Sequence, residues 1–333
     1  MTYQARPNAV IVAGETLAAI QGDEQLSKDF IDLAEKANVV LACRVSPKQK
    51  AEVVLMMRGR HPEKSTLAIG DGANDVNMIN AAHIGIGIAG LEGAQAARAA
   101  DYSIGQFRFL KNLMFCHGRE AYRRNSYLIS YMFYKNVLYV IPIWMYGWVS
   151  FFSGTIIFSN TLYAGYNVIF TAFPIMWFAV FDWEHDKRTF LNNPQFYRIG
   201  LEDIFFDKST FWRWFFYACW QGTVLMFLSF YTLDGNSDGI MQMGELEIDG
   251  QFVFAALVII VNVKVLISSY QYTFWILFWV LGSIASFFPV FWAVCYFGNY
   301  PYAGVFNHMF ASGQVYMLLI FFTSCFVLID QGL

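Results

Sequence analysis

The chain has 333 residues, of which 57 % are hydrophobic, 19 % aromatic and only 14 % charged. This apolar content exceeds what a soluble globular protein buries, so part of the surface must face lipid. The 22 basic and 25 acidic residues almost cancel, which excludes the strongly basic surface that nucleic-acid binding needs. The five cysteines are scattered, without a C-x-x-C pair, and predict free thiols rather than a disulfide framework or a zinc site.

Up to about residue 110, short apolar runs alternate with helical stretches. The apolar runs predict buried parallel strands at Val10–Ala13, Val39–Cys43, Thr66–Ile69 and Ile84–Ile88. Helices are predicted at Ser27–Ala37, Pro47–Arg58 and Asp75–Ala82. This alternation is typical of a doubly wound α/β domain. The first residues lack the charged start and apolar core of a secretory signal, so we expect this domain in the cytosol.

The rest of the chain is predicted to form a helical stalk over residues 111–127 and a membrane domain over residues 128–333. Crossing a bilayer takes about 20 helical residues, and six apolar segments approach this length. They lie at about 128–149, 161–181, 211–233, 252–270, 272–296 and 313–330. The 182–210 loop contains Lys and Arg residues, whereas the 150–160, 234–250 and 297–312 loops contain none. By the positive-inside rule, the 182–210 loop and both ends of the chain are expected to be cytosolic.

The strongest chemical signal is GDGAND (70–75), directly after the predicted strand at 66–69. Ligands of open α/β sheets bind at this end of a strand. One of Asp71 and Asp75 could reach a hard cation such as Mg²⁺ while the other steadies the loop or a water. The same residues also suit an ordinary turn and helix cap, and this alternative stays open. Lys50, after the strand at 39–43, could offer a charge to a phosphoryl group, although a lysine there is more often a solvated helix residue.

Longer motifs carry a resemblance to a known family. They are CRVSPKQK (43–50), GDGANDVNMI (70–79), AHIGIGIAGLEGAQA (82–96), DYSIGQFRFLKNLMFCHGREAYRR (101–124), FYKN (133–136), FSG (152–154) and YNVIFTAFP (166–174). Together they resemble type IV P-type ATPases, the lipid flippases. The resemblance implies part of a HAD-like, Rossmannoid α/β phosphorylation domain at residues 1–110, followed by an all-α bundle of six transmembrane helices.

The resemblance also implies roles for residues of the first domain. Asp71 would ligate the catalytic Mg²⁺, Asn74 and Asp75 would support the metal and phosphate site, Lys50 would contact the phosphoryl group, and ATP would supply it. The family carries its aspartate nucleophile in a D-K-T-G motif, which does not occur in this sequence. The chain alone therefore cannot form an aspartyl phosphate, and we expect a piece of a longer polypeptide or a truncated gene product.

Few charges lie inside the predicted spans. Counted up to Ile329, the spans contain no Asp or Glu, and we take Lys135 and Lys264 as their intramembrane charges. A path for metal cations would need carboxylates in the membrane, so this composition disfavours a cation pump. Lys264, near the end of its span, is expected to snorkel to the cytosolic surface.

Four residues form the predicted substrate path. A buried Lys135 next to Asn136 would suit an anionic lipid headgroup, because both are costly in hydrocarbon. The resemblance adds Asn167 of the second span as their neighbour. At the place where cation-pumping relatives have an acidic residue, three positions before Pro174, this sequence has Thr171. The alternative is that Lys135 snorkels to the membrane surface.

Two further motifs are expected to be coincidental. Residues 85–90, GIGIAG, fit G-x-G-x-x-G, but the glycines lie largely within a predicted strand, and no acidic residue follows about 20 positions later. Residues 234–245, DGNSDGIMQMGE, fit the EF-hand loop pattern. Because they join two predicted spans, an ordinary polar turn is favoured over a Ca²⁺ site.

These observations predict the C-terminal part of an ATP-driven flippase that moves phospholipid to the cytosolic leaflet. We expect a multi-pass protein of the plasma membrane or of Golgi and endosomal membranes. The resemblance implies a small two-span glycoprotein subunit as a partner. Two rival hypotheses are a catalytically inactive truncated membrane protein with a scaffold or regulatory role, and a cation-pumping P-type ATPase.

Overall fold

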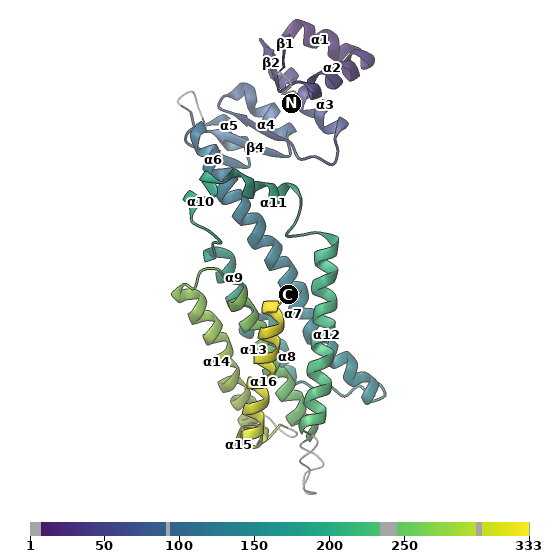
Figure 1. Ribbon diagram of the computed structural model, residues 1–333, viewed down its shortest axis with the longest axis vertical. Coiled ribbons are helices and arrows are strands. Elements are labelled where there is room, and N and C mark those ends of the chain that lie inside the picture. Colours follow the sequence, from purple (N-terminus) through teal and green to yellow (C-terminus); the bar gives the residue numbers. More distant parts are fainter. Residues whose placement is uncertain (1–7, 91–93, 234–244, 298–301, 333) are drawn as a thin grey trace, which may run out of the picture. The chain divides into compact units, whose positions relative to one another are not determined.

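The computed structural model describes residues 8–90, 94–233, 245–297 and 302–332 (Figure 1). The chain divides into two compact units, residues 1–114 and residues 115–333. Residues 234–244 of the EF-hand-like stretch lie outside the described ranges.

The described part of the N-terminal unit contains short parallel strands in two sheets. β1 (Ala9–Ala13) pairs with β2 (Val39–Cys43), while β4 (Ile84–Ile88) lies between β3 (Leu67–Gly70) and β5 (Tyr102–Ile104). The four predicted strands are confirmed, and β5 is additional, because three residues are too few to give a periodic pattern. The described strands do not form one continuous doubly wound sheet, so the HAD-like topology stays a prediction.

Helices follow the strands of this unit. They are α1 (Gly14–Gly22), α2 (Glu24–Lys36), α3 (Pro47–Arg60), the 3₁₀ turn η1 (Ala73–Asp75), α4 (Val76–Ala81), α5 (Gln95–Ala99), the 3₁₀ turn η2 (Phe107–Phe109) and α6 (Leu110–Asn112). α3 begins where predicted because Ser46 and Gln49 form a reciprocal capping box and Pro47 occupies the first turn. The predicted helix at 27–37 is confirmed and begins earlier, where the Asp23 carboxylate accepts hydrogen bonds from the backbone of Gln25 and Leu26.

The described part of the C-terminal unit is helical. Its elements are a π-helical turn (Leu113–Gly118), α7 (Arg119–Val149), α8 (Asn160–Gly165), a second π-helical turn (Tyr166–Phe170), α9 (Ala172–Phe181), α10 (Lys187–Asn192), the 3₁₀ turn η5 (Pro194–Tyr197), α11 (Arg198–Leu201), α12 (Lys208–Leu233), α13 (Glu245–Ser268), α14 (Phe274–Phe297), α15 (Val305–Ala311) and α16 (Gly313–Gly332). The two longest helices, α7 and α12, pack along each other (Figure 1).

Among the described residues, four helical segments are long and apolar enough to cross a membrane. They are Asn160–Phe181, Leu246–Ser268, Phe274–Phe297 and Gly313–Gly332, and they correspond to four of the six predicted spans. α7 and α12, with 31 and 26 residues, are long enough but less apolar. The protein therefore has a membrane-spanning C-terminal part, while the count of six spans stays a prediction.

α13 is the central helix of the bundle. Of its most apolar stretch 78 % is buried, against 22–33 % for the other three apolar segments. The ring of Phe254 on α13 contacts the rings of Tyr166, Phe170 and Phe287, which belong to neighbouring segments. The other helices therefore cover α13 and leave their own outer faces to lipid.

The second predicted span is interrupted. α8 ends at Gly165, a π-helical turn follows, and α9 begins at Ala172. Between them Thr171 has φ −136° and ψ −4°, outside the helical region. Pro174 contributes to this break because it has no N–H to donate to the carbonyl four residues before it. The interruption fixes the direction of the Thr171 side chain.

Candidate functional site

In the N-terminal unit, the side chains of Lys50 and Asp75 form an ion pair. Lys50 Nζ, on α3, lies 2.7 Å from Asp75 Oδ1 in η1. The Asp75 side chain is only 9 % exposed and that of Lys50 26 %. The backbone N–H of Asp71 donates to the other oxygen of Asp75 at 3.3 Å. Each carboxylate oxygen of Asp75 thus accepts a hydrogen bond, and the buried side chain lies beneath the GDGAND loop.

The packing of this loop requires a glycine at position 70, and Gly72 also lies close to a neighbouring side chain. A Cβ at Gly70 would lie 2.3 Å from the Cβ of Asp75, and a Cβ at Gly72 would lie 2.6 Å from Asn74 Oδ1. Both Asp71 and Asn74 are exposed. The loop therefore folds tightly over Asp75 and leaves the Asp71 carboxylate and the Asn74 amide accessible.

The donor set is compatible with Mg²⁺. Mg²⁺ is usually held by one or two protein carboxylates and keeps several waters. The exposed carboxylate of Asp71 can serve as a direct ligand, whereas the oxygens of Asp75 already accept hydrogen bonds from Lys50 and from the Asp71 backbone. Within the described residues, no group of three or more His, Cys, Asp or Glu is placed to hold a metal ion.

In the membrane part, Lys135 meets Thr171. The Lys135 side chain is buried, with the residue 1 % exposed, so the snorkelling alternative is wrong. Its Nζ donates to Thr171 Oγ1 at 2.9 Å, and the Thr171 hydroxyl donates to the carbonyl of Tyr166 at 2.8 Å. The hydroxyl of Tyr166 returns a hydrogen bond to the Lys135 carbonyl at 3.0 Å. α7 and the broken span are therefore joined by a closed polar cluster.

The other two residues of the predicted path lie outside this cluster. Asn136 is half-buried, and its amide donates to the Met132 carbonyl of its own helix at 2.9 Å. Asn167 is exposed on the π-helical turn. Tyr166, which the sequence-based interpretation missed, takes the place expected for Asn167. Adjacent side chains on a helix point about 100° apart. Because the turn here is π-helical, the sequence alone does not show which of Tyr166 and Asn167 faces Lys135.

The expectation that Lys264 snorkels is wrong. Its Nζ lies 2.6 Å from Asp330 Oδ1 on α16. It also lies 4.8, 5.1 and 4.7 Å from the ring centres of Tyr134, Trp214 and Tyr217. The carboxylate and the rings hold the ammonium inside the bundle.

The charge count of the predicted spans needs a related correction. Asp330 closes the segment at 313–330, one residue beyond the point to which acidic residues were counted, and α16 continues to Gly332. Arg213 is a further charge near the start of α12. Both lie toward the ends of their helices. The middle parts of the predicted spans therefore contain no Asp or Glu, but their ends carry charges besides Lys135 and Lys264.

A buried ion network around Asp182 was also missed. Its Oδ2 accepts from Arg123 at 2.7 Å, and its Oδ1 accepts the backbone N–H groups of Tyr270 and Gln271 at 2.8 and 3.0 Å. One carboxylate thus ties the start of α7, the end of α9 and the connection between α13 and α14. The signal in the sequence was an aspartate directly after an apolar span, which is costly unless it has partners.

Glu120 extends this network on α7. Its carboxylate pairs with Arg119 and Arg123, and it also accepts the backbone N–H of Glu184 at 3.4 Å. Burial alone would lower the pKa of Arg123, but the hydrogen bond to Asp182 and the charge of Glu120 raise it above its ordinary value. The guanidinium therefore stays charged and keeps the network intact.

The two motifs taken as coincidental have separate outcomes. Gly85 and Gly87 lie in β4, where a Cβ would meet Ile79 Cγ2 at 2.5 Å and the Ala96 carbonyl oxygen at 2.5 Å. They serve close packing of the helices on the sheet, as expected for a strand rather than a dinucleotide loop. The EF-hand-like stretch stays a prediction because it lies outside the described residues.

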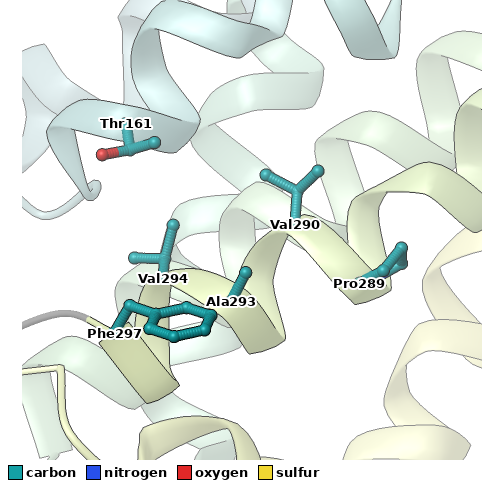
Figure 2. A pocket seen from close by; sticks show the side chains of 6 residues that line it. All are labelled: Thr161, Pro289, Val290, Ala293, Val294 and Phe297. Atoms are coloured by element: carbon teal, nitrogen blue, oxygen red, sulfur yellow. The ribbon is translucent and has the colours of Figure 1, made fainter.

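An apolar hollow of about 560 Å³ lies between α8 and α14. Figure 2 shows its lining residues: Thr161, Pro289, Val290, Ala293, Val294 and Phe297. None of the predicted site residues lines it. With one hydroxyl and no ionisable group, it offers no catalytic chemistry.

Comparisons with known proteins assign the chain to a family. The family model described as "Phospholipid-translocating P-type ATPase C-terminal" matches residues 97–332. The chain is 36 % identical over 331 residues to phospholipid-transporting ATPase DRS2 of Saccharomyces cerevisiae, covering 96 % of this chain and 24 % of that protein. It is 38 % identical over 272 residues to human phospholipid-transporting ATPase IC, covering 80 % of this chain and 21 % of the relative. To phospholipid-transporting ATPase C887.12 of Schizosaccharomyces pombe it is 39 % identical over 279 residues, with 83 % and 22 % covered.

The chain thus spans less than a quarter of the length of these relatives. The matched segment contains the predicted stalk, the broken second span and every membrane residue described above. From these matches we conclude that the chain belongs to the phospholipid-translocating P-type ATPase family.

Proposed function

We propose that this chain is the C-terminal part of an ATP-driven flippase that moves phospholipid to the cytosolic leaflet. The carrying observation is the buried Lys135, whose partner is the hydroxyl of Thr171. Among the described residues, no carboxylate lies within ion-pair distance of Lys135. An ammonium without a counter-ion in a low-dielectric bundle can bind an anionic lipid phosphate, and it would repel a metal cation.

The N-terminal unit would supply part of the phosphoryl-transfer site. Asp71 is proposed to bind Mg²⁺ and Asn74 to contact the phosphate. Lys50, fixed by Asp75, would place its charge beside the phosphoryl group that ATP delivers. When bound, Mg²⁺ would neutralise charge on that group. The nucleophilic aspartate is proposed to come from a segment outside this chain, because no D-K-T-G occurs in it.

We propose that α7 and α12 are also spans, which gives six. The polarity of α7 is inverted relative to a soluble helix: Tyr131, Tyr134 and Lys135 are buried, whereas Phe133 and Trp144 are exposed. On α12, Gln221 and Ser229 are buried while apolar side chains are exposed. An apolar outer face around a polar inner face is expected where the surrounding solvent is lipid.

The remaining assignments are proposals of the same kind. The boundaries stay at 1–110 for the partial phosphorylation domain, 111–127 for the stalk and 128–333 for the membrane domain. The N-terminal domain, the 182–210 loop and the C-terminus are proposed to be cytosolic, supported by the Lys and Arg residues of that loop. The plasma membrane or Golgi and endosomal membranes, and a two-span glycoprotein subunit, follow from the family resemblance.

Reconstitution of the longer polypeptide tests the function. With a fluorescent phospholipid in vesicles, we expect ATP and Mg²⁺ to move label toward the leaflet that faces the cytosolic domains. Lys135→Met should lower lipid-stimulated turnover at least about tenfold, the effect of losing one charged contact, while the phosphorylated enzyme still forms. The control Lys187→Met changes a lysine of the proposed cytosolic loop and should have no such effect.

Two outcomes would favour the rival hypotheses. Stimulation of ATP hydrolysis by metal ions rather than by phospholipid would indicate a cation pump. Absence of hydrolysis under every lipid composition, with the protein folded, would indicate a scaffold or regulator.

A further inference from the structure

The break in the second span leaves a backbone carbonyl without its usual helical donor. In an α-helix the N–H of residue 174 would donate to the carbonyl of residue 170. Position 174 is a proline, which has no N–H. An unsatisfied carbonyl is costly in the interior of a membrane protein. The Phe170 carbonyl therefore needs a donor from another part of the chain.

Asn262 on α13 is that donor. Its Nδ2 lies 2.9 Å from the Phe170 carbonyl oxygen and 2.8 Å from the Val258 carbonyl oxygen of its own helix. The residue is 0 % exposed. The amide has two N–H groups, so one is anchored on α13 and the other reaches across to the broken span. Its Oδ1 makes no hydrogen bond within the described ranges, which leaves donation as the role of this side chain.

The Asn262 contact completes a triangle of polar contacts between three segments. The hydroxyl of Tyr131 on α7 donates to the Val261 carbonyl of α13 at 3.3 Å. Asn262 joins α13 to the broken span at Phe170, and Thr171, the next residue, receives Lys135 of α7. Each pair of segments is therefore linked by at least one hydrogen bond. Without the Asn262 side of the triangle, the backbone that carries Thr171 would lose its hydrogen bond to α13, while ring contacts such as that of Phe254 with Phe170 would remain.

We propose that Asn262 is a positioning residue of the lipid path. It supplies the hydrogen bond that Pro174 cannot make, and by holding the Phe170 carbonyl it keeps the Thr171 hydroxyl against the Lys135 ammonium. Its importance for transport rests on the proposed function, because Lys135 and Thr171 are the groups that would meet the lipid. That the Asn262 amide takes the place of the missing Pro174 N–H does not depend on what is transported.

A double-mutant cycle between positions 262 and 174 tests the proposal in the longer polypeptide. Asn262→Leu removes the donor at similar volume, and Pro174→Ala restores a backbone N–H. We expect N262L alone to raise the phospholipid concentration for half-maximal ATPase stimulation about fivefold or more, as for the loss of one hydrogen bond. Formation of the phosphorylated enzyme should stay unchanged. In the P174A background the same substitution should change that concentration less than about twofold.

Thermal unfolding of the same four proteins provides a second measurement. N262L should lower the unfolding temperature in the presence of Pro174, and by clearly less in the P174A background. Gln251→Leu is the matched control, since Gln251 is a fully buried amide on the same helix whose side-chain atoms make no hydrogen bond to any described residue. Its replacement should not lower the unfolding temperature and should not change the lipid dependence.

Equal effects of N262L in both backgrounds, on lipid dependence and on unfolding, would overturn the proposal. Loss of stability with an unchanged lipid dependence would also overturn it, because the residue would then be structural only. If the unsubstituted protein shows no response to phospholipid, the proposed function fails. The unfolding cycle then still decides whether Asn262 replaces the missing N–H of Pro174.

Discussion

Lys50 and Asp75 show what single residues contribute to the cytosolic site. Asp75 is almost fully buried, and its carboxylate depends on the Lys50 ammonium 2.7 Å away. Removal of one member of such a pair leaves the other charge desolvated and unpaired. Lys50 therefore stabilises the fold of the GDGAND loop through its ion pair with Asp75, whether or not a phosphate is bound.

We predict that Lys50→Gln destabilises the loop and β3. The free energy of opening of the β3 amides, measured by hydrogen exchange, should fall by about 1.5 kcal/mol, the lower end for a hydrogen bond to a charged group, because Lys50 is partly exposed. Lys48→Gln is the control: Lys48 is 85 % exposed and lies 3.5 Å from Glu52, so its loss should have an effect below about 0.5 kcal/mol. Equal effects of the two substitutions would contradict the prediction.

For the two lysines in the membrane, the sequence predicts the intramembrane charge but not its partner. Lys135 and Lys264 were recognised as intramembrane charges from composition. Their environments differ because Lys264 has Asp330 as a partner, 66 positions along the chain, and Lys135 has a hydroxyl. Sequence spacing does not bring such distant positions together. The predicted substrate path includes both Lys135 and Thr171 but has Asn167 as the neighbour of Lys135, whereas the structure shows the contact with Thr171.

At the level of elements, strong periodic patterns were predictable and interruptions were not. The strands at β1 to β4 and the start of α3 follow from apolar runs and capping residues. The sequence also contained Pro174, yet the segment at 161–181 was predicted as one unbroken span. Proline indicates only that a donor is missing. Whether the helix kinks or breaks depends on where another donor lies, here Asn262 on a different helix.

The proposed six spans lead to a topology prediction. Ser153 lies between α7 and α8, Asn193 lies between α9 and α12, and both are exposed. In a background without the exposed Cys43, Ser153→Cys should react with an impermeant thiol reagent added to intact cells. Asn193→Cys should react only after permeabilisation. If only the four most apolar segments cross the membrane, the two cysteines will show the opposite accessibilities, since α7 and α12 would no longer reverse the chain.

At the scale of the whole molecule, the N-terminal unit has unpaired sheet edges. Among the described strands, β1 pairs only with β2, and β3 pairs only with β4. Apolar side chains beside these edges are exposed, with Ile11 at 72 % and Leu67 at 40 %. Long unpaired edges with apolar side chains favour addition of another strand. We therefore expect β1, β3 or both to gain a strand in the longer polypeptide that carries the proposed nucleophile.

Hydrogen exchange can detect this added strand. Amides of β1 and β3 that lack a partner in this chain should exchange at least about tenfold more slowly in the longer polypeptide, because a paired strand opens only with its neighbours. β4 is the internal control, since it already lies between β3 and β5 and its amides should change least. Unchanged exchange in β1 and β3 would mean that these edges stay open, and the nucleophile would then have to reach Asp71 and Lys50 from a segment that does not join either sheet.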